Sequence, residues 1–181
     1  MRVAFSDERV DKSPGQTLIV GVGNRLLGDE GIGPHIIDHL LKLPMPPDVS
    51  IVDCGCDLLN LVSYLDKPQK IILVDAIRAG GKPGQIHRFD FNELQGAQTK
   101  SHSAHQMKVV DVLRLLKQVC PCLADCKFIL IGIEPKAIYL STDLSKEVRD
   151  SIVDLTGLLL QETSLSRERE EPSTAIKGEL N

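Results

Sequence analysis

Aromatic residues are scarce in this 181-residue chain, which has no Trp, two Tyr and four Phe. Stacking platforms for bases or sugars are therefore not expected. Positive charge is not in excess either, because 25 acidic residues outnumber 21 Lys and Arg and leave a net charge of −4. This balance argues against nucleic acid or an anionic membrane as the main partner, since both are bound through basic surfaces.

Long apolar runs and a secretory signal are also missing. No run approaches the roughly 20 residues that span a membrane, and residues 1–15 carry acids and lack an apolar core. Disulfides are not expected, because the five cysteines are an odd number and no signal directs the chain to an oxidising compartment. We therefore expect a cytoplasmic protein with reduced thiols.

The cysteine spacing does not predict a zinc site. The patterns Cys54-x-Cys56 and Cys120-x-Cys122-x3-Cys126 lack the C-x2-C pairs that are typical of structural zinc. Surface or core thiols are the better interpretation. A serine hydrolase or a zincin has no support, since neither G-x-S-x-G nor H-E-x-x-H occurs.

From residue 17 onward the hydrophobic pattern alternates between strand and helix periods. Strands are expected over 17–23, 49–53, 70–76 and 127–133, with an edge strand or hairpin arm over 85–91. Helices are expected from near Asp29 or Glu30 to residue 43, and over 56–65, 105–119 and 144–162. This order predicts a three-layer α/β/α domain with a mostly parallel twisted sheet and one antiparallel edge strand.

The same pattern divides the chain into three parts. Residues 1–16 are a polar lead-in, residues 17–162 form a single α/β domain, and residues 163–181 are a polar tail without sustained periodicity. We expect the tail to be disordered.

In such a domain the working site lies outside the carboxyl ends of the strands. Four strand ends deliver the segments 21–31, 53–57, 75–77 and 133–135 to this edge, and SHSAHQ (101–106) leads into the following helix. Acidic residues and a histidine therefore converge there.

The glycine-rich segment GVGNRLLGDEG does not predict a nucleotide site. The dinucleotide fingerprint requires a third glycine where Leu26 stands, and no G-x-x-x-x-G-K-S/T motif occurs. Gly21 and Gly23 fit either a tight strand-to-helix turn with positive φ or a role in the site, and the sequence leaves both open.

Each candidate side chain at this edge also has a structural interpretation. Asp29 and Glu30 stand where a helix begins, and capping with a favourable helix dipole accounts for Asp29. Asp75 ends an apolar strand, where a buried carboxylate needs either a hydrogen-bond partner or a function. His105 opens a helix, with His102 as its competitor, and a neutral imidazole there suits either the surface or a metal.

The segments GVGNRLLGDEGIGPHIIDHL, DCG, ILVDAI, SAHQ and IGIEP together resemble the hydrogenase maturation proteases. These endopeptidases trim the C-terminal extension from the large subunit of nickel–iron hydrogenases. The resemblance runs from about Thr17 to Leu160, and its most specific part is the G-[IV]-G-N-x-L-x-x-D-[DE]-G opening. It implies the same mostly parallel sheet between helices.

The resemblance also implies a site. The family's metal-contacting residues match Glu30, Asp75 and His105, and its D-x-G aspartate, linked to recognition or cleavage, matches Asp53. His105 is chosen over His102 because it directly precedes the helix. Cys54 and Cys56 replace residues that are often small or hydroxylic in the family, which leaves the motif intact.

What the resemblance implies for function is a metal-dependent endopeptidase that acts on a hydrogenase large-subunit precursor. Nickel would be supplied by that substrate, and a divalent ion could occupy the site of the isolated protein, which we expect to be a monomer. A three-ligand site without thiolates is not expected to retain zinc tightly. The alternative is a non-catalytic, nickel-sensing assembly chaperone that uses the same edge.

Overall fold

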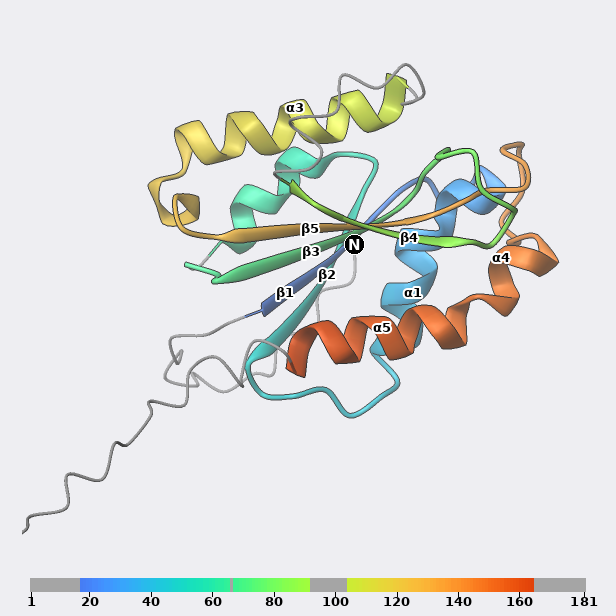
Figure 1. Cartoon of the computed structure of the whole chain (residues 1–181), viewed down its shortest axis with the longest axis horizontal. Coiled ribbons are helices and arrows are strands. Elements are labelled where there is room, and N and C mark those ends of the chain that lie inside the picture. Colours follow the sequence, from blue (N-terminus) through green and yellow to red (C-terminus); the bar gives the residue numbers. More distant parts are fainter. Residues whose placement is uncertain (1–16, 66, 92–103, 165–181) are drawn as a thin grey trace, which may run out of the picture.

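The computed structural model describes residues 17–65, 67–91 and 104–164, and the side chains of the helix at 104–119 from Val109 onward. Figure 1 shows a sheet covered by helices on both faces. Its strands are β1 (Thr17–Val22), β2 (Val49–Gly55), β3 (Lys70–Ala76), β4 (Ile86–Asp90) and β5 (Lys127–Ile133). The helices are η1 (Gly28–Gly31), α1 (Ile32–Leu40), η2 (Leu58–Tyr64), α3 (Ala104–Val119), η3 (Pro121–Leu123), α4 (Lys146–Asp150) and α5 (Ile152–Ser164).

The strand order is β2-β1-β3-β5-β4. β1, β2, β3 and β5 are parallel, and β4 pairs antiparallel with β5 at the edge. All seven residues of β3 are buried between β1 and β5. The predicted mostly parallel sheet with one antiparallel edge strand is therefore confirmed.

Alternating residues of the central strands feed two separate cores. Ile71 and Leu73 pack with α3 and η2 on one face, while Ile72 and Val74 pack with α1 and α5 on the other. This follows from the two-residue period of a strand, which sends successive side chains to opposite faces. A parallel sheet buried on both faces explains why the strands read as continuous apolar runs.

Three expected helices differ in form. The helix expected from near Asp29 or Glu30 to residue 43 begins as the 3-10 helix η1, and its α-helical part, α1, ends at Leu40. Residues 58–64 make a 3-10 helix, begun by Asp57, whose carboxylate accepts the Leu59 N–H. The segment is short, and the Asn60 and Ser63 side chains compete for the backbone hydrogen bonds that an α-helix needs. The expected helix over 144–162 is split into α4 and α5 at Ser151, whose hydroxyl donates to Val148 O at 2.8 Å.

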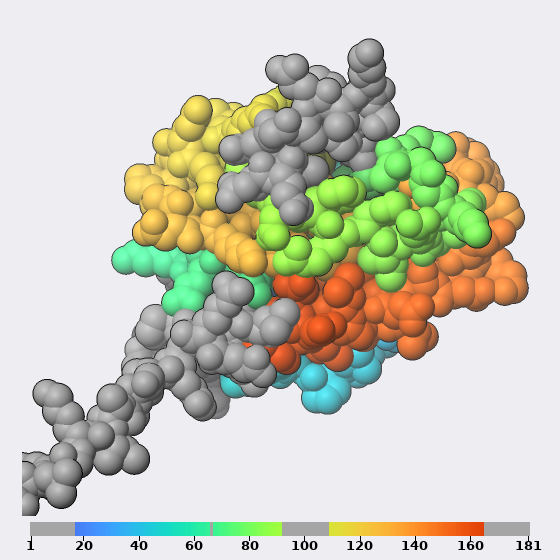
Figure 2. All heavy atoms as spheres, viewed as in Figure 1, coloured from blue at the N-terminus to red at the C-terminus, as the bar shows by residue number. Residues whose placement is uncertain are grey.

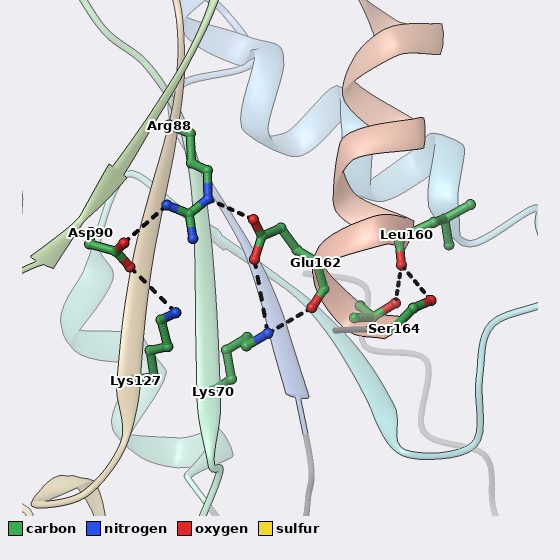
Figure 3. A network of polar contacts seen from close by, with 8 residues as sticks. Lys70, Arg88, Asp90, Lys127, Leu160, Glu162 and Ser164 are labelled. Carbon is green, nitrogen blue, oxygen red and sulfur yellow. Dashed lines mark hydrogen bonds and ion pairs between the residues drawn. The ribbon is translucent and has the colours of Figure 1, made fainter. Parts of the chain in front are cut away.

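A polar network ties α5 to the amino end of the sheet, away from the edge where the strands end (Figure 3). Glu162 is buried; its carboxylate lies 2.6 Å from Arg88 Nε, and its carbonyl accepts from Lys70 Nζ at 2.7 Å. Asp90 in turn contacts Arg88 and Lys127. These contacts fix α5 against β3 and β4, and Asp90 links the network to β5.

The final helix extends to Ser164, two residues past the predicted domain boundary, and Thr163 is buried within it. The lead-in 1–16 and residues 165–181 of the tail lie outside the described residues, so expectations about them stay predictions. In the described part of the chain, no helix is long and apolar enough to cross a membrane.

Candidate active site at the carboxyl edge of the sheet

The segments that follow β3 and β5 lie at the right of Figure 1, the side toward which both strands run. η1, which follows β1, contacts β3 there. Figure 2 shows the segment after β5 beside the segment after β3 on the molecular surface. The predicted convergence of strand ends is therefore present.

Glycines let the chain after β1 return tightly onto the sheet. A Cβ on Gly21 would lie 2.4 Å from Gly33 O, and one on Gly23 would lie 1.9 Å from Glu30 O. Gly23 has φ of 138°, whereas Gly21 does not have a positive φ. The turn interpretation therefore holds for Gly23, and Gly21 serves the close approach of α1 to the strand.

Asp29 is only 1% exposed and is not the helix cap that was expected. Neither η1 nor α1 has a side-chain cap hydrogen bond. Instead, Asp29 Oδ2 accepts the N–H groups of Lys136 at 2.8 Å and Ala137 at 3.1 Å, and Oδ1 accepts that of Ser145 at 2.7 Å. The carboxylate thus anchors the segment after β5, because three backbone donors offset the cost of burying its charge.

Glu30 follows directly and is half-buried. The charge of Glu30 acts on Cys56, in the segment after β2. The pKa of the Cys56 thiol is raised mainly by partial burial, and further by the negative charges of Glu30 and Asp53. Cys56 Sγ lies 3.7 Å from Gly23 O. Glu30 therefore lies near the loops that follow β1 and β2.

Asp75 occupies the end of central β3 and is 1% exposed. It is in register with Gly132 of β5, and its Oδ1 accepts the Ala76 N–H at 2.8 Å. A carboxylate at this depth is costly unless polar or cationic groups surround it. Its position at the carboxyl end of the sheet agrees with the sequence prediction.

Asp53 lies on β2, beyond β1 from Asp75. It is in register with Gly21, as is Val74 of β3, so the strands of Asp53 and Asp75 are about 10 Å apart. Asp53 Oδ1 accepts the Gly55 N–H at 2.9 Å, and Oδ2 accepts from Arg25 Nη2 at 2.8 Å. Asp53 is thus held in a fixed orientation on the flank of the site.

His105 lies in the first turn of α3, but its side chain is outside the described residues. α3 begins on the side toward which β3 and β5 run (Figure 1). Among the residues whose side chains are described, no group of three or more His, Cys, Asp or Glu could hold a metal ion. The meeting of Glu30, Asp75 and His105 therefore stays a prediction.

Glu134 is an element of this edge to which the sequence assigned no role. It is 6% exposed, and its Oε2 accepts the N–H groups of Ala79 at 2.8 Å and Gly81 at 3.1 Å. His87 Nε2 lies 3.6 Å from the same oxygen. Glu134 thus fixes the loop that follows Asp75. The available signal was an acid directly after an apolar strand, the same signal that singled out Asp75.

All five cysteines are free thiols, as expected. Burial, with help from nearby charges, raises the pKa of Cys54 to about 12, and burial raises that of Cys126 to about 12. Both therefore stay protonated at neutral pH.

Fold and site together define a three-layer α/β protein with buried and half-buried carboxylates at the carboxyl edge of its sheet. The sequence profile of the hydrogenase maturation protease family matches residues 34–162. The chain therefore belongs to the hydrogenase maturation protease family.

Individual relatives agree. The chain is 32% identical to the hydrogenase 2 maturation protease of Escherichia coli over 123 residues, which cover 67% of this chain and 74% of the relative. It is 30% identical over 158 residues to the hydrogenase expression/formation protein HupD of Bradyrhizobium diazoefficiens. These residues cover 84% of this chain and 81% of the relative.

Solved structures show the same fold. The hydrogenase maturating endopeptidase HybD from Escherichia coli superposes with a TM-score of 0.71 at 28% identity, covering 83% of this chain and 93% of that one. The NiFe hydrogenase maturation protease HybD from Thermococcus kodakarensis superposes with a TM-score of 0.69 at 28% identity, covering 80% of this chain and 99% of that one.

Proposed function

We propose that this protein is an endopeptidase that removes the C-terminal extension of a nickel–iron hydrogenase large-subunit precursor after nickel insertion. Family membership supports this activity, since relatives that match most of the chain are named as hydrogenase maturation proteases. The observation that carries it in this chain is the buried Asp75 carboxylate at the end of the central strand.

The proposed metal-contacting residues are Glu30, Asp75 and His105, with the nickel arriving as part of the substrate. Carboxylate and imidazole groups suit a borderline divalent ion, and the donor set lacks the thiolates that retain zinc tightly. We propose that the isolated protein is largely free of metal as purified, acts as a monomer and works in the cytoplasm.

The proposed chemistry divides the work between substrate and protein. The nickel supplies Lewis-acid polarisation at the scissile peptide. A carboxylate of the protein takes the proton of the attacking water, and Glu30 and Asp75 are the candidates. Asp53, held by Arg25, orients the precursor at the flank of the site.

The alternative is a nickel-sensing assembly chaperone that binds the precursor without cutting it. Incubating the purified protein with nickel-loaded precursor and measuring the mass of the large subunit separates the two. Loss of the C-terminal extension supports the endopeptidase. Stable binding with an unchanged mass supports the chaperone.

A further inference from the structure

Four large apolar side chains are exposed together beside the carboxyl edge. Leu26, Ile138, Tyr139 and Leu140 are 56%, 43%, 57% and 82% exposed. We call this set the apolar ridge. Single exposed apolar residues are ordinary, but several on adjoining loops are typical of an interaction surface.

The backbone beneath the apolar ridge is tied down. Ser141 N–H donates to Leu26 O at 2.9 Å, and Gly28 N–H donates to Ser141 O at 2.8 Å. Asp29 holds the N–H groups of Lys136 and Ala137, the two residues that precede Ile138. A surface held in place in this way loses little conformational freedom when it binds, so its apolar area contributes more fully to affinity.

The apolar ridge is continuous with the candidate active site. Leu26 lies just before η1, which contains Glu30, and the Asp29 carboxylate links η1 to the segment carrying Tyr139. That segment, from the end of β5 to α4, lies at the outer right of Figure 2. A protein whose scissile segment reaches Glu30 therefore comes within reach of the apolar ridge, because Leu26 lies only four residues away along the chain.

The chemistry of the ridge indicates the kind of surface it binds. Residues 137–142 read Ala-Ile-Tyr-Leu-Ser-Thr and contain no charged side chain. Complementarity then comes from apolar contact, with the Tyr139 hydroxyl as a polar edge, and not from ion pairs.

We propose that the apolar ridge is the docking surface for an apolar patch on the folded body of the precursor, next to its scissile segment. This inference rests on the proposed function. It adds a second contact, which holds the precursor through its folded surface while its C-terminal segment enters the site.

The test compares Leu140→Asp and Tyr139→Ser with Val153→Asp. Val153 is 74% exposed on α5 and lies outside the ridge, so it controls for adding a charge at an exposed apolar position. For each protein, Kd for nickel-loaded precursor, KM, kcat, melting temperature and self-association by light scattering are measured. We expect the ridge variants to raise Kd and KM by about tenfold or more, with kcat within about twofold and unchanged melting temperature. Val153→Asp should match the wild type.

The ratio of the Tyr139→Ser Kd to the wild-type Kd should also change little up to about 0.5 M salt, since the ridge itself holds no charged side chain. If the wild type cleaves the precursor but the ridge variants keep its KM and Kd, the docking inference is wrong and the proposed function stands. If the wild type binds the precursor without cleaving it, the proposed function is wrong. The Kd of the ridge variants relative to the wild type then decides the docking inference, which an unchanged Kd would contradict. Failure to bind at all contradicts both. Wild-type self-association that Leu140→Asp abolishes, with precursor affinity unchanged, assigns the ridge to a second copy and also overturns the inference.

Discussion

The guanidinium of Arg25 lies 2.8 Å from the carboxylate of Asp53, and its other amino group lies 2.5 Å from Asp38 of α1. The same guanidinium donates to Pro34 O at 3.1 Å. One side chain thus connects the turn after β1, the following helix and the end of β2. The aspartate that the family resemblance links to recognition is held from two sides, by Arg25 and by the Gly55 N–H.

Replacing Arg25 with Met keeps much of the apolar stem and removes the charge. We expect a loss of about 1 kcal/mol in the free energy of unfolding, because the Arg25 side chain is 40% exposed and the solvent screens its ion pairs. Urea denaturation measures the loss. Lys146→Met, which breaks the more exposed Lys146–Asp150 pair, should change nothing measurable. Equal effects of the two substitutions would contradict the claim that the contacts of Arg25 stabilise the fold more than an exposed surface ion pair does.

Asp29→Asn should destabilise the protein far more than an ordinary surface change. One carboxylate oxygen becomes an NH2 group, so at least one of the three N–H donors faces another donor and all lose their charged acceptor. We expect a loss of about 3 kcal/mol. Asp125→Asn, at an exposed position, is the control and should stay within about 0.5 kcal/mol of the wild type. A neutral effect of Asp29→Asn would mean that the carboxylate is no anchor.

The buried thiols predict a pH dependence. The pKa of Cys54 and of Cys126 is raised from 9.0 to about 12 in the folded protein, mainly by burial. The folded state therefore holds protons that unfolded thiols release. Their contribution to stability is complete below pH about 9 and is lost between about 9 and 12. The urea midpoint should fall across that window.

Alkylation gives an independent measurement of the same shift. Iodoacetamide at pH about 8.5 should modify Cys56 in the folded protein, because its thiol is exposed, and spare Cys54 and Cys126, whose thiols are buried and protonated. Peptide mass spectrometry after quenching identifies the modified positions. Modification of Cys54 at the rate found in denatured protein would refute the burial argument.

Asp75→Asn should leave the fold intact and abolish processing. Asn has nearly the same shape but is a weaker metal ligand and no base, and residue 75 is buried among well-packed strands. Melting temperature and the mass of the incubated precursor are measured together. Full processing by a folded Asp75→Asn variant would remove Asp75 from the proposed site.

The strands β1, β3 and β5 were predictable because they are buried on both faces and therefore read as apolar runs that end at or next to Gly, Asp or Glu. Thr17–Val22, Lys70–Ala76 and Lys127–Ile133 lie where the pattern placed them, within a residue. Short segments were less predictable. Residues 58–64 carry an apolar pattern that fits an α-helix, but their length and polar residues leave a 3-10 helix.

The role of Asp29 could not be read from the sequence, because its partners lie more than 100 residues further along the chain. A carboxylate at a helix start is ordinarily interpreted as a cap, and only the folded arrangement shows what it binds. The same holds for Glu134, whose donors at Ala79 and Gly81 precede it by more than 50 residues. Asp75 was identified because a charge at the end of an apolar strand is conspicuous without any knowledge of its neighbours.

The central claim is that cleavage follows the metal state of the precursor and not that of the protease. The direct measurement incubates chelator-treated, desalted protein with nickel-loaded precursor and with nickel-free precursor, and follows the mass of the large subunit. We expect normal shortening of the nickel-loaded precursor and none of the nickel-free one. If the chelator-treated protein is inactive, and zinc alone restores cleavage of nickel-free precursor, the protein is an ordinary metalloprotease and the account is wrong.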